Sequence, residues 1–274
     1  MPQLVTDIIS TDKAVANSEK RLSICLRSNG FSFSVVSTDD TLLTFGVVQS
    51  QQPLSASQLA QQVVQTLGEH DAVLDYKEMR LVIPSMHFVW IPAHLYDPSH
   101  NRQYLATVAP VDHEANICRS YSKSLDSYIV FTAPADIVTA FKIAIPGVDI
   151  ICQHAVLADA LPVSTYKNHP AILLHLRDNV ADIEAFYNGR LLLSASYPAQ
   201  NNDELLYHAI NVMKQLHLET PDMELAICGM VDRDIYSHLQ HFFPNVTLFT
   251  GKPFTYLNPD FQTLHTYMHT LVLS

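Results

Sequence analysis

Two stretches of this chain end an apolar run with the same arginine pattern. Residues 22–29 read LSICLRSN, and residues 172–179 read ILLHLRDN. The aliphatic positions agree, and the second leucine, the arginine and the asparagine coincide, which places Arg27 and Arg177 about 150 residues apart. Self-similarity at a fixed distance predicts that one structural unit, beginning with this strand, occurs twice in the chain.

The residues after each arginine follow the same order of expected elements. Large apolar residues alternate with serine over residues 31–35, as period 2 in a strand requires. The pair Asn188-Gly189 predicts a tight hairpin in the second copy. We therefore expect three-stranded units at 22–48 and 172–196 that lie in separate sheets.

An amphipathic helix follows the strands in each copy. Ser55 and Gln58 can form a capping box in the first copy, and Asn202 can cap the helix in the second. The apolar residues at helical spacing are Leu59, Val63 and Leu67 in the first copy and Leu206, Ile210, Met213 and Leu216 in the second. A short strand follows each helix, so the order β-β-β-α-β is expected twice.

The remaining segments set the expected domain boundaries. Residues from about 96 to 120 interrupt the pattern and predict a small insertion in the first half. Residues 161–170, LPVSTYKNHP, have the polar, proline-containing composition of a linker. We expect a first domain at 1–162 and a second at 163–274, the latter including a helix capped by Asp232 and a final amphipathic stretch.

The composition of the chain argues against several classes of function. The net charge is −11 over 274 residues and no block of five basic residues occurs, which argues against a nucleic-acid surface. No apolar run has the ~20 residues that a membrane helix needs, and the first residues do not resemble a signal peptide. The cysteines form no CxxC pair; they are Cys25, Cys118, Cys152 and Cys228. We expect a cytoplasmic protein with reduced thiols and no membrane insertion.

Four segments carry a resemblance to known proteins: LSICLRSNGFSFSVV, RLVIPSMHFVWIP, AILLHLRDNVADIEAFYNGRLLLS and ELAICGM. They resemble the actin-like superfamily of sugar kinases, heat-shock ATPases and actin, and more closely the pilus-assembly protein PilM, the cytoplasmic domain of the type II secretion protein EpsL and a bacterial family of unknown function. The resemblance covers nearly the whole chain outside residues 96–120. It implies an α/β fold of duplicated actin-like (ribonuclease H-like) βββαβα domains around a central cleft.

The resemblance also implies that the nucleotide-binding loops are degenerate. In active members the first strand of each domain ends in Asp-x-Gly-Thr/Ser, where the Asp organises Mg²⁺ through water and the Gly lets the backbone approach the phosphates. The corresponding residues here run from Cys25 to Ser28 and from His175 to Asp178, so both acids and both glycines are absent. A paired glycine near the adenosine site is reduced to one. The candidate cleft residues are Arg27, Ser28, Asn29, Arg177, Asp178, Asn179 and Gly229.

Strand alternation predicts where the two arginine side chains point. Leu26 should be buried on the face opposite Cys25 and Arg27, and Leu176 should be buried in the same way in the second copy. Both arginines should then face the cleft, which we expect to hold no nucleotide. They could bind an anion from two sides, although an ion pair with Asp178 or Asp182 is the simpler expectation.

Other sets of reactive residues carry weaker signals. His265 and His269 are four residues apart on an expected helix, and His238 and His241 are three apart, but neither pair has an evident third ligand. Cys25 has the context of a buried apolar residue and not of a nucleophile. We expect no metal and no cofactor.

The leading hypothesis is a non-catalytic actin-like scaffold or adaptor that acts by binding an unidentified protein partner. Its basis is a retained two-domain scaffold with degenerate phosphate loops. An ATP-binding kinase or ATPase with an atypical phosphate site is the alternative, and a metal-dependent hydrolase is a third class. Homodimer formation stays an open alternative.

Overall fold

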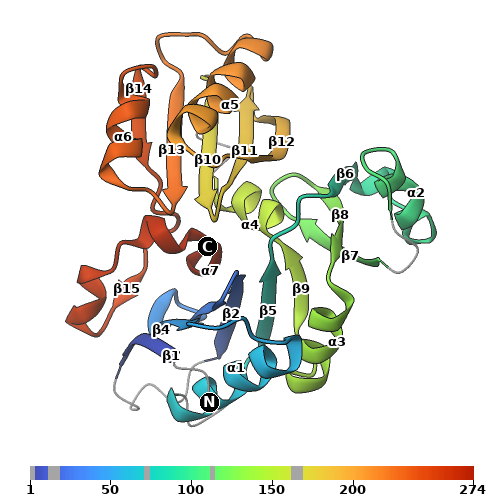
Figure 1. Ribbon diagram of the computed structural model, residues 1–274, viewed down its shortest axis with the longest axis vertical. Helices are drawn as coiled ribbons and strands as arrows, with labels where there is room; N and C mark the ends of the chain where they lie inside the picture. The colour runs from blue at the N-terminus through green and yellow to red at the C-terminus, as the bar shows by residue number, and fades with distance from the viewer. Residues whose placement is uncertain (1–3, 12–18, 71–74, 112–114, 162–168) are drawn as a thin grey trace.

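The computed structural model describes residues 4–11, 19–70, 75–111, 115–161 and 169–274. These residues form two large β-sheets and one small β-sheet, with helices packed between and outside the large sheets (Figure 1). The chain therefore has the mixed α/β class that its sequence predicts.

The two large sheets repeat one strand order. In the first sheet the strands lie in the order β4-β3-β2-β5-β9: β4, β3 and β2 are antiparallel, and β5 and β9 continue parallel to β2. In the second sheet the strands β12-β11-β10-β13-β14 follow the same order with the same directions. The first sheet consists of β1 (Leu4–Ser10), β2 (Lys20–Arg27), β3 (Gly30–Ser37), β4 (Thr41–Ser50), β5 (Glu78–Ile83), β9 (Asp149–Cys152) and β15 (Thr255–Tyr256). The second consists of β10 (Ala171–Arg177), β11 (Val180–Tyr187), β12 (Arg190–Pro198), β13 (Glu224–Gly229) and β14 (Asn245–Leu248). The predicted duplication in two separate sheets is confirmed.

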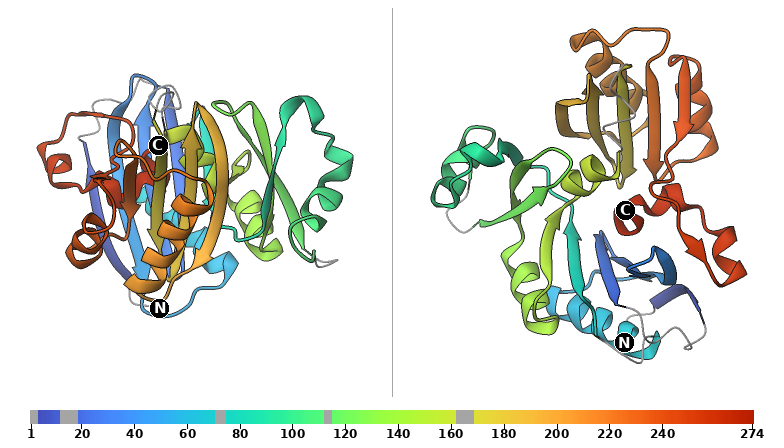
Figure 2. Two further views of the ribbon diagram at one scale, coloured as in Figure 1. Left: turned by 90° about the horizontal axis from the view of Figure 1, so that it is seen from above. Right: turned by 180° about the vertical axis from the view of Figure 1, so that it is seen from behind.

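Sheets and helices alternate in layers (Figure 2). One core joins the outer helices α1 and α3 to the first sheet, through residues such as Val63, Phe141 and Ile24. A second core lies between the sheets and includes Leu157 of α4 and Val272 of α7. A third joins α5 and α6 to the outer face of the second sheet. The helices are α1 (Ala56–His70), α3 (Ala135–Ala144), α4 (Gln153–Ala160), α5 (Asn202–Gln215), α6 (Arg233–Gln240) and α7 (Thr270–Leu273).

The predicted strand parity is confirmed in both copies. Leu26 and Leu176 are buried in the two outer cores, whereas Cys25 belongs to the core between the sheets. His175, on the face opposite Leu176, is also buried. Since side chains two residues apart share a face of a strand, this register turns Arg27 and Arg177 toward the space between the sheets.

Two of the predicted helix caps are confirmed, and one is shifted by a residue. Ser55 and Gln58 exchange backbone-to-side-chain hydrogen bonds of 3.0 and 3.3 Å, so the capping box is present, and the Asp232 carboxylate caps α6. The cap of α5 is Asn201 and not Asn202, because the Asn201 side chain accepts from the backbone N–H of Glu204.

The predicted insertion is part of a larger unit. Strands β6 (Phe88–Pro92), β7 (Asn116–Ser122) and β8 (Ser127–Ala133) form a separate antiparallel sheet, which carries the short helix α2 (Asn101–Ala106). This unit projects to one side of the first sheet in Figure 1. It begins before residue 96 and ends after residue 120 because the inserted strand β7 needs β8 as its hydrogen-bonding partner.

The C-terminal segment returns from the second sheet to the first. Strand β15 pairs in parallel with β4, and α7 packs on β2 and β3. The Ser34 hydroxyl donates a 2.5 Å hydrogen bond to the carbonyl of Val272. This part of the predicted second domain therefore lies against the first sheet. The predicted boundary at 162/163 and most of the linker lie outside the described residues.

Candidate functional site

The turns that follow the two arginines meet each other. Arg27 pairs with Gly30 across the β2–β3 hairpin, and Arg177 pairs with Val180 across the β10–β11 hairpin. Between these turns, the Ser28 hydroxyl donates a 2.5 Å hydrogen bond to Oδ2 of Asp178. The two equivalent positions of the repeat are thus in direct contact.

A cleft with a volume of about 660 Å³ lies beside this contact. Most of the predicted residues line it: Arg27, Ser28, Asn29, Arg177, Asp178 and Gly229. Asn179 lines a smaller neighbouring cavity instead, where it follows Asp178 around the turn. Six of the seven predicted residues therefore line one cleft, and their correspondence to a nucleotide-binding site stays a prediction.

Arg177 forms a bidentate ion pair with Asp182. Its Nε and Nη2 donate to the two carboxylate oxygens at 2.8 and 3.1 Å, and Asp182 is completely buried. The same carboxylate receives a 2.5 Å hydrogen bond from Ser196 and contacts Nδ1 of His175 at 3.2 Å. Burial opposes ionisation, but the hydrogen bonds from His175 and Arg177 and the charge of His154 hold the pKa of Asp182 well below its ordinary value. The predicted local ion pair is confirmed for Arg177.

Arg27 has a different partner. Its Nη2 lies 3.3 Å from Nδ1 of His269, whose ring packs on Phe45 with centroids 4.6 Å apart. Burial and the charge of Arg27 lower the pKa of His269 to about 4, so this imidazole is neutral at pH 7 and accepts a hydrogen bond from the guanidinium. Within the described segments, no carboxylate forms an ion pair with Arg27.

A buried polar network connects α4 to the second sheet. Nδ1 of His154 is hydrogen-bonded to Oε1 of Glu184, and Nε2 of His154 lies 2.9 Å from the Ser196 hydroxyl. Ser194 also donates to Glu184, at 3.0 Å. His154, Asp182 and Glu184 are all completely buried, and Oε2 of Glu184 has no hydrogen-bond partner among the described residues. The network thus joins an element of the first half of the chain to β11 and β12.

Sequence reasoning found only Asp182 from this network. The available signal was the alternation of Asp182 and Glu184 with apolar residues on β11, matched by Ser194 and Ser196 on the neighbouring strand β12. Two acids in a strand buried on both faces require polar partners.

The network predicts an effect of Glu184→Gln on the pH dependence of stability. Burial raises the pKa of the Glu184 carboxyl above 4.5, so the folded state binds this proton more tightly than the unfolded chain. Wild-type protein should therefore lose stability relative to Glu184→Gln as the pH rises from about 4.5 toward neutral, because the proton that the folded state holds is then released. Urea denaturation of both proteins across this range measures the difference, and a constant or opposite difference would contradict the prediction.

The weaker candidate sites do not assemble. The described segments hold no group of three or more His, Cys, Asp or Glu residues that could bind a metal ion. His265 precedes a short 3-10 helix that ends at His269, so the two do not lie on one α-helix as expected, because the helix α7 begins only after them. Burial raises the pKa of the Cys25 thiol to about 12, which disfavours the nucleophilic thiolate.

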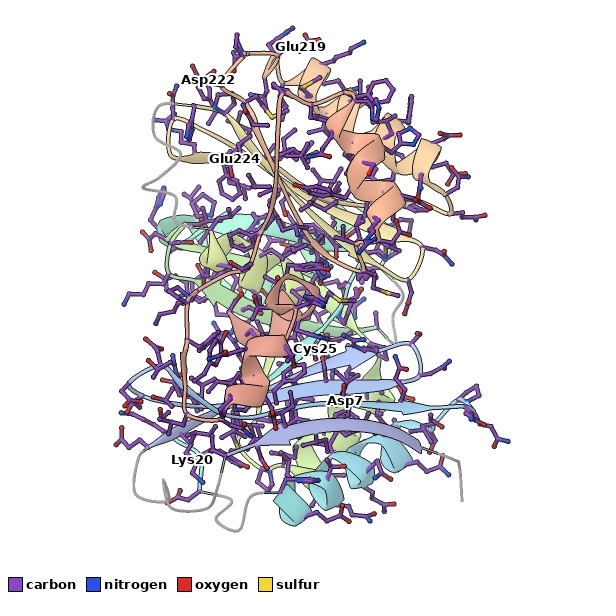
Figure 3. The ribbon with its side chains drawn as sticks, turned by 90° about the vertical axis from the view of Figure 1, so that its left-hand side faces the viewer. Asp7, Lys20, Cys25, Glu219, Asp222 and Glu224 are labelled. Atoms are coloured by element: carbon purple, nitrogen blue, oxygen red, sulfur yellow. The ribbon has the colours of Figure 1, made fainter. Side chains whose placement is uncertain are left out.

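Three acidic residues near the end of the second sheet lie away from the cleft. Figure 3 shows Glu219, Asp222 and Glu224 at the far end of the second sheet, whereas Cys25 lies on the first sheet near the C-terminal segment.

Among the helices that the structure describes, none combines the length and the apolar character required to cross a membrane.

Comparison with known proteins identifies a family and a fold. A family model described as protein of unknown function (DUF3822) matches residues 10–246. No curated protein matches the sequence. A solved structure from Bacteroides thetaiotaomicron, of unknown function with an actin-like ATPase fold, is 20% identical; the match covers 96% of this chain and 99% of that one, with a TM-score of 0.68.

Two further solved structures are more distant. The PilM–PilN type IV pilus biogenesis complex contains a chain that is 10% identical, with 92% of this chain and 96% of that chain covered and a TM-score of 0.52. The ethanolamine utilization protein EutJ from Carboxydothermus hydrogenoformans is 8% identical over 93% of this chain and 90% of that one, with a TM-score of 0.45. The predicted actin-like fold is confirmed; the resemblance to EpsL stays a prediction.

Proposed function

The chain belongs to the DUF3822 family of proteins of unknown function, and we propose that it is a non-catalytic actin-like scaffold or adaptor that binds another protein. The observation that carries this proposal is the direct hydrogen bond between Ser28 and Asp178. The resemblance to active actin-like proteins implies that nucleotide phosphates would approach these two turns. Here the turns contact each other, and each is preceded by an arginine in place of a glycine.

The charges around the turns support the same proposal. Phosphoryl transfer depends on a metal ion and on donors that stabilise the transferring group. The buried acid nearest to the second turn, Asp182, is occupied by Arg177, Ser196 and His175. Asp178 accepts the hydrogen bond from Ser28. Both carboxylates near the turns therefore already have partners within the chain.

A protein partner is the role that best fits a retained scaffold without this chemistry. The similar protein PilM is solved in a complex with PilN, and we extend this kind of role, though not that partner, to the present chain. The four cysteines are free thiols, which fits our proposal of a cytoplasmic location. An atypical ATP-binding site is the alternative because a cleft of about 660 Å³ remains beside the turns.

The proposal predicts that Mg-ATP does not bind the protein measurably. Isothermal titration of the wild-type chain should give no saturable heat at nucleotide concentrations up to about 1 mM, which corresponds to a binding free energy weaker than about −4 kcal/mol. The double variant His175→Asp with Arg177→Gly should also fail to hydrolyse ATP, because Arg27 still occupies the first loop. Saturable micromolar binding by the wild type, or hydrolysis above background by either protein, would replace the scaffold proposal with the ATPase alternative.

A further inference from the structure

Three exposed methionines gather around the mouth of the cleft. Met86, Met230 and Met268 expose 40%, 53% and 37% of their surface. Met230 and Met268 line the cleft, and Sδ of Met86 lies 3.8 Å from Nη2 of Arg177. The other methionines that the structure describes, Met79, Met213 and Met223, are buried or half-buried.

These methionines come from three separate parts of the chain. Met86 follows β5, Met230 follows β13, and Met268 lies in the turn before α7. The fold therefore brings them to one opening. Methionine is flexible and polarisable, and proteins use it at surfaces that must adapt to a bound apolar side chain. Exposed apolar groups that cluster in this way mark interaction sites.

The walls of the cleft continue the apolar character inward. They include Leu54 and Pro134, which precede α1 and α3, Ile137 of α3, and Pro84, which follows β5. The lining also includes polar side chains such as Ser32, Gln49 and Ser50, so this cleft of about 660 Å³ offers both apolar and polar contacts to a small number of bound side chains.

One cation in this cleft lacks an anionic partner. The Arg27 guanidinium contacts only the neutral ring of His269 among the side-chain hydrogen bonds of the described residues, and it forms no ion pair there. Arg177 is neutralised by Asp182, and the Asp178 carboxylate is held by Ser28. A carboxylate that entered the cleft could accept two parallel hydrogen bonds from Arg27, the strongest pairing available to it.

We propose that the cleft binds a segment of a partner protein that carries a carboxylate side chain next to bulky apolar side chains. The carboxylate pairs with Arg27, and the apolar side chains pack on Met230, Met268 and the apolar wall. This inference rests on the proposed scaffold function and names the chemistry of its partner. A partner of this kind supplies an acid to the one cleft arginine that has no ion pair among the described residues, whereas Asp178 keeps its own charge and is held by the Ser28 hydroxyl.

Selection from a random 12-residue peptide display library on the full chain tests this inference. The selected peptides should be enriched in Asp or Glu beside Leu, Phe or Met. Fluorescence titration of one selected peptide should show binding at least about 10-fold weaker to Arg27→Gln than to wild type, and weaker also to Met230→Ser. Arg190→Gln, which removes an exposed arginine at the start of β12, is the matched control and should bind like wild type.

A change in the peptide completes the test. Replacing its acidic residue by the corresponding amide should weaken binding to wild type and leave binding to Arg27→Gln unchanged, since the two changes remove the same contact. Failure to select peptides, selection without acidic enrichment, or equal binding by Arg27→Gln would overturn the inference. Self-association that Arg27→Gln abolishes would assign the cleft to a second copy and would also overturn it. These outcomes are independent of the Mg-ATP titration, which tests the scaffold proposal alone.

Discussion

Asp182→Ala is expected to destabilise the protein by about 3–5 kcal/mol, because it removes one partner of a buried ion pair and leaves the other without a counter-charge. Asp182 is completely buried and binds Arg177 through both carboxylate oxygens. Ser196 and His175 also lose a partner in this variant. Urea denaturation at neutral pH measures the change in unfolding free energy.

Two further measurements separate the ion pair from general damage. Asp203→Ala is the matched control: its side chain is 90% exposed, so the loss should stay within about 1 kcal/mol. The double variant Arg177→Ala with Asp182→Ala should be less destabilised than the sum of the single variants, because the second change removes the uncompensated charge. A loss below about 1 kcal/mol for Asp182→Ala would show that the carboxylate is not the centre of the network.

The pH dependence of this contribution has a defined sign. The folded pKa of Asp182 lies below its ordinary value of 3.8, so the unfolded chain binds this proton more tightly than the folded protein does. The stability that Asp182 contributes is therefore present above about pH 4 and is lost as the pH falls. Glu184 acts in the opposite direction because its pKa is raised. The two acids of β11 thus titrate with opposite effects on stability, although they are two residues apart on one strand.

The sequence predicts the fold well because its main signals are local. The turns after Arg27 and Arg177 and the helical spacing depend on neighbouring residues and occur in both copies, and the hairpin at Asn188-Gly189 is a local signal of the second copy. Each pattern alone is a weak indication of structure, and its recurrence in the second copy strengthens the prediction of a duplicated fold. The direction of both arginine side chains also follows from local alternation, which is why the cleft could be located before any tertiary contact was known.

The local pair of Arg177 with Asp182 follows from sequence proximity, but the contacts between distant residues around the two arginines could not be predicted in the same way. His154 reaches Glu184 across 30 residues of sequence, and His269 reaches Arg27 across 242. Nothing in the spacing of either histidine indicates which sheet it faces. The C-terminal segment shows the same limit: its apolar residues predict an amphipathic element, but a turn this short has no periodicity that identifies β2 and β3 as its packing surface.

These unpredicted contacts decide how the space between the sheets is used. Helices α4 and α7 fill most of it with apolar packing, and the buried network fixes α4 to the second sheet. The cleft beside Ser28 and Asp178 stays open, as does a second cavity of about 560 Å³ between α4 and the C-terminal segment. A chain that joins its two halves through its own side chains needs no nucleotide to hold them together, which is consistent with the proposed scaffold.

Gly229→Ala is expected to destabilise the protein by about 2–5 kcal/mol, the sum of backbone strain and overpacking. Gly229 has a φ of +86°, which L side chains rarely adopt. An added Cβ would lie 2.1 Å from the carbonyl oxygen and 2.9 Å from the nitrogen of Leu176. Both are backbone atoms of the neighbouring strand β10, so they cannot move without loss of the β10–β13 pairing. Thermal and urea denaturation measure the loss.

Gly68→Ala is the control for this change. Gly68 lies on the exposed side of α1, and no atom outside its own helix surroundings lies within 4 Å of an added Cβ. This variant should gain about 0.5–1 kcal/mol because alanine favours a helix over glycine. The contrast bears on the resemblance, which implies that Gly229 corresponds to one glycine of a pair near the adenosine site. Close backbone packing against β10 is a sufficient structural reason for a glycine at this position. Tolerance of Gly229→Ala, with a loss below about 1 kcal/mol, would remove that reason and restore Gly229 as a candidate nucleotide-binding residue.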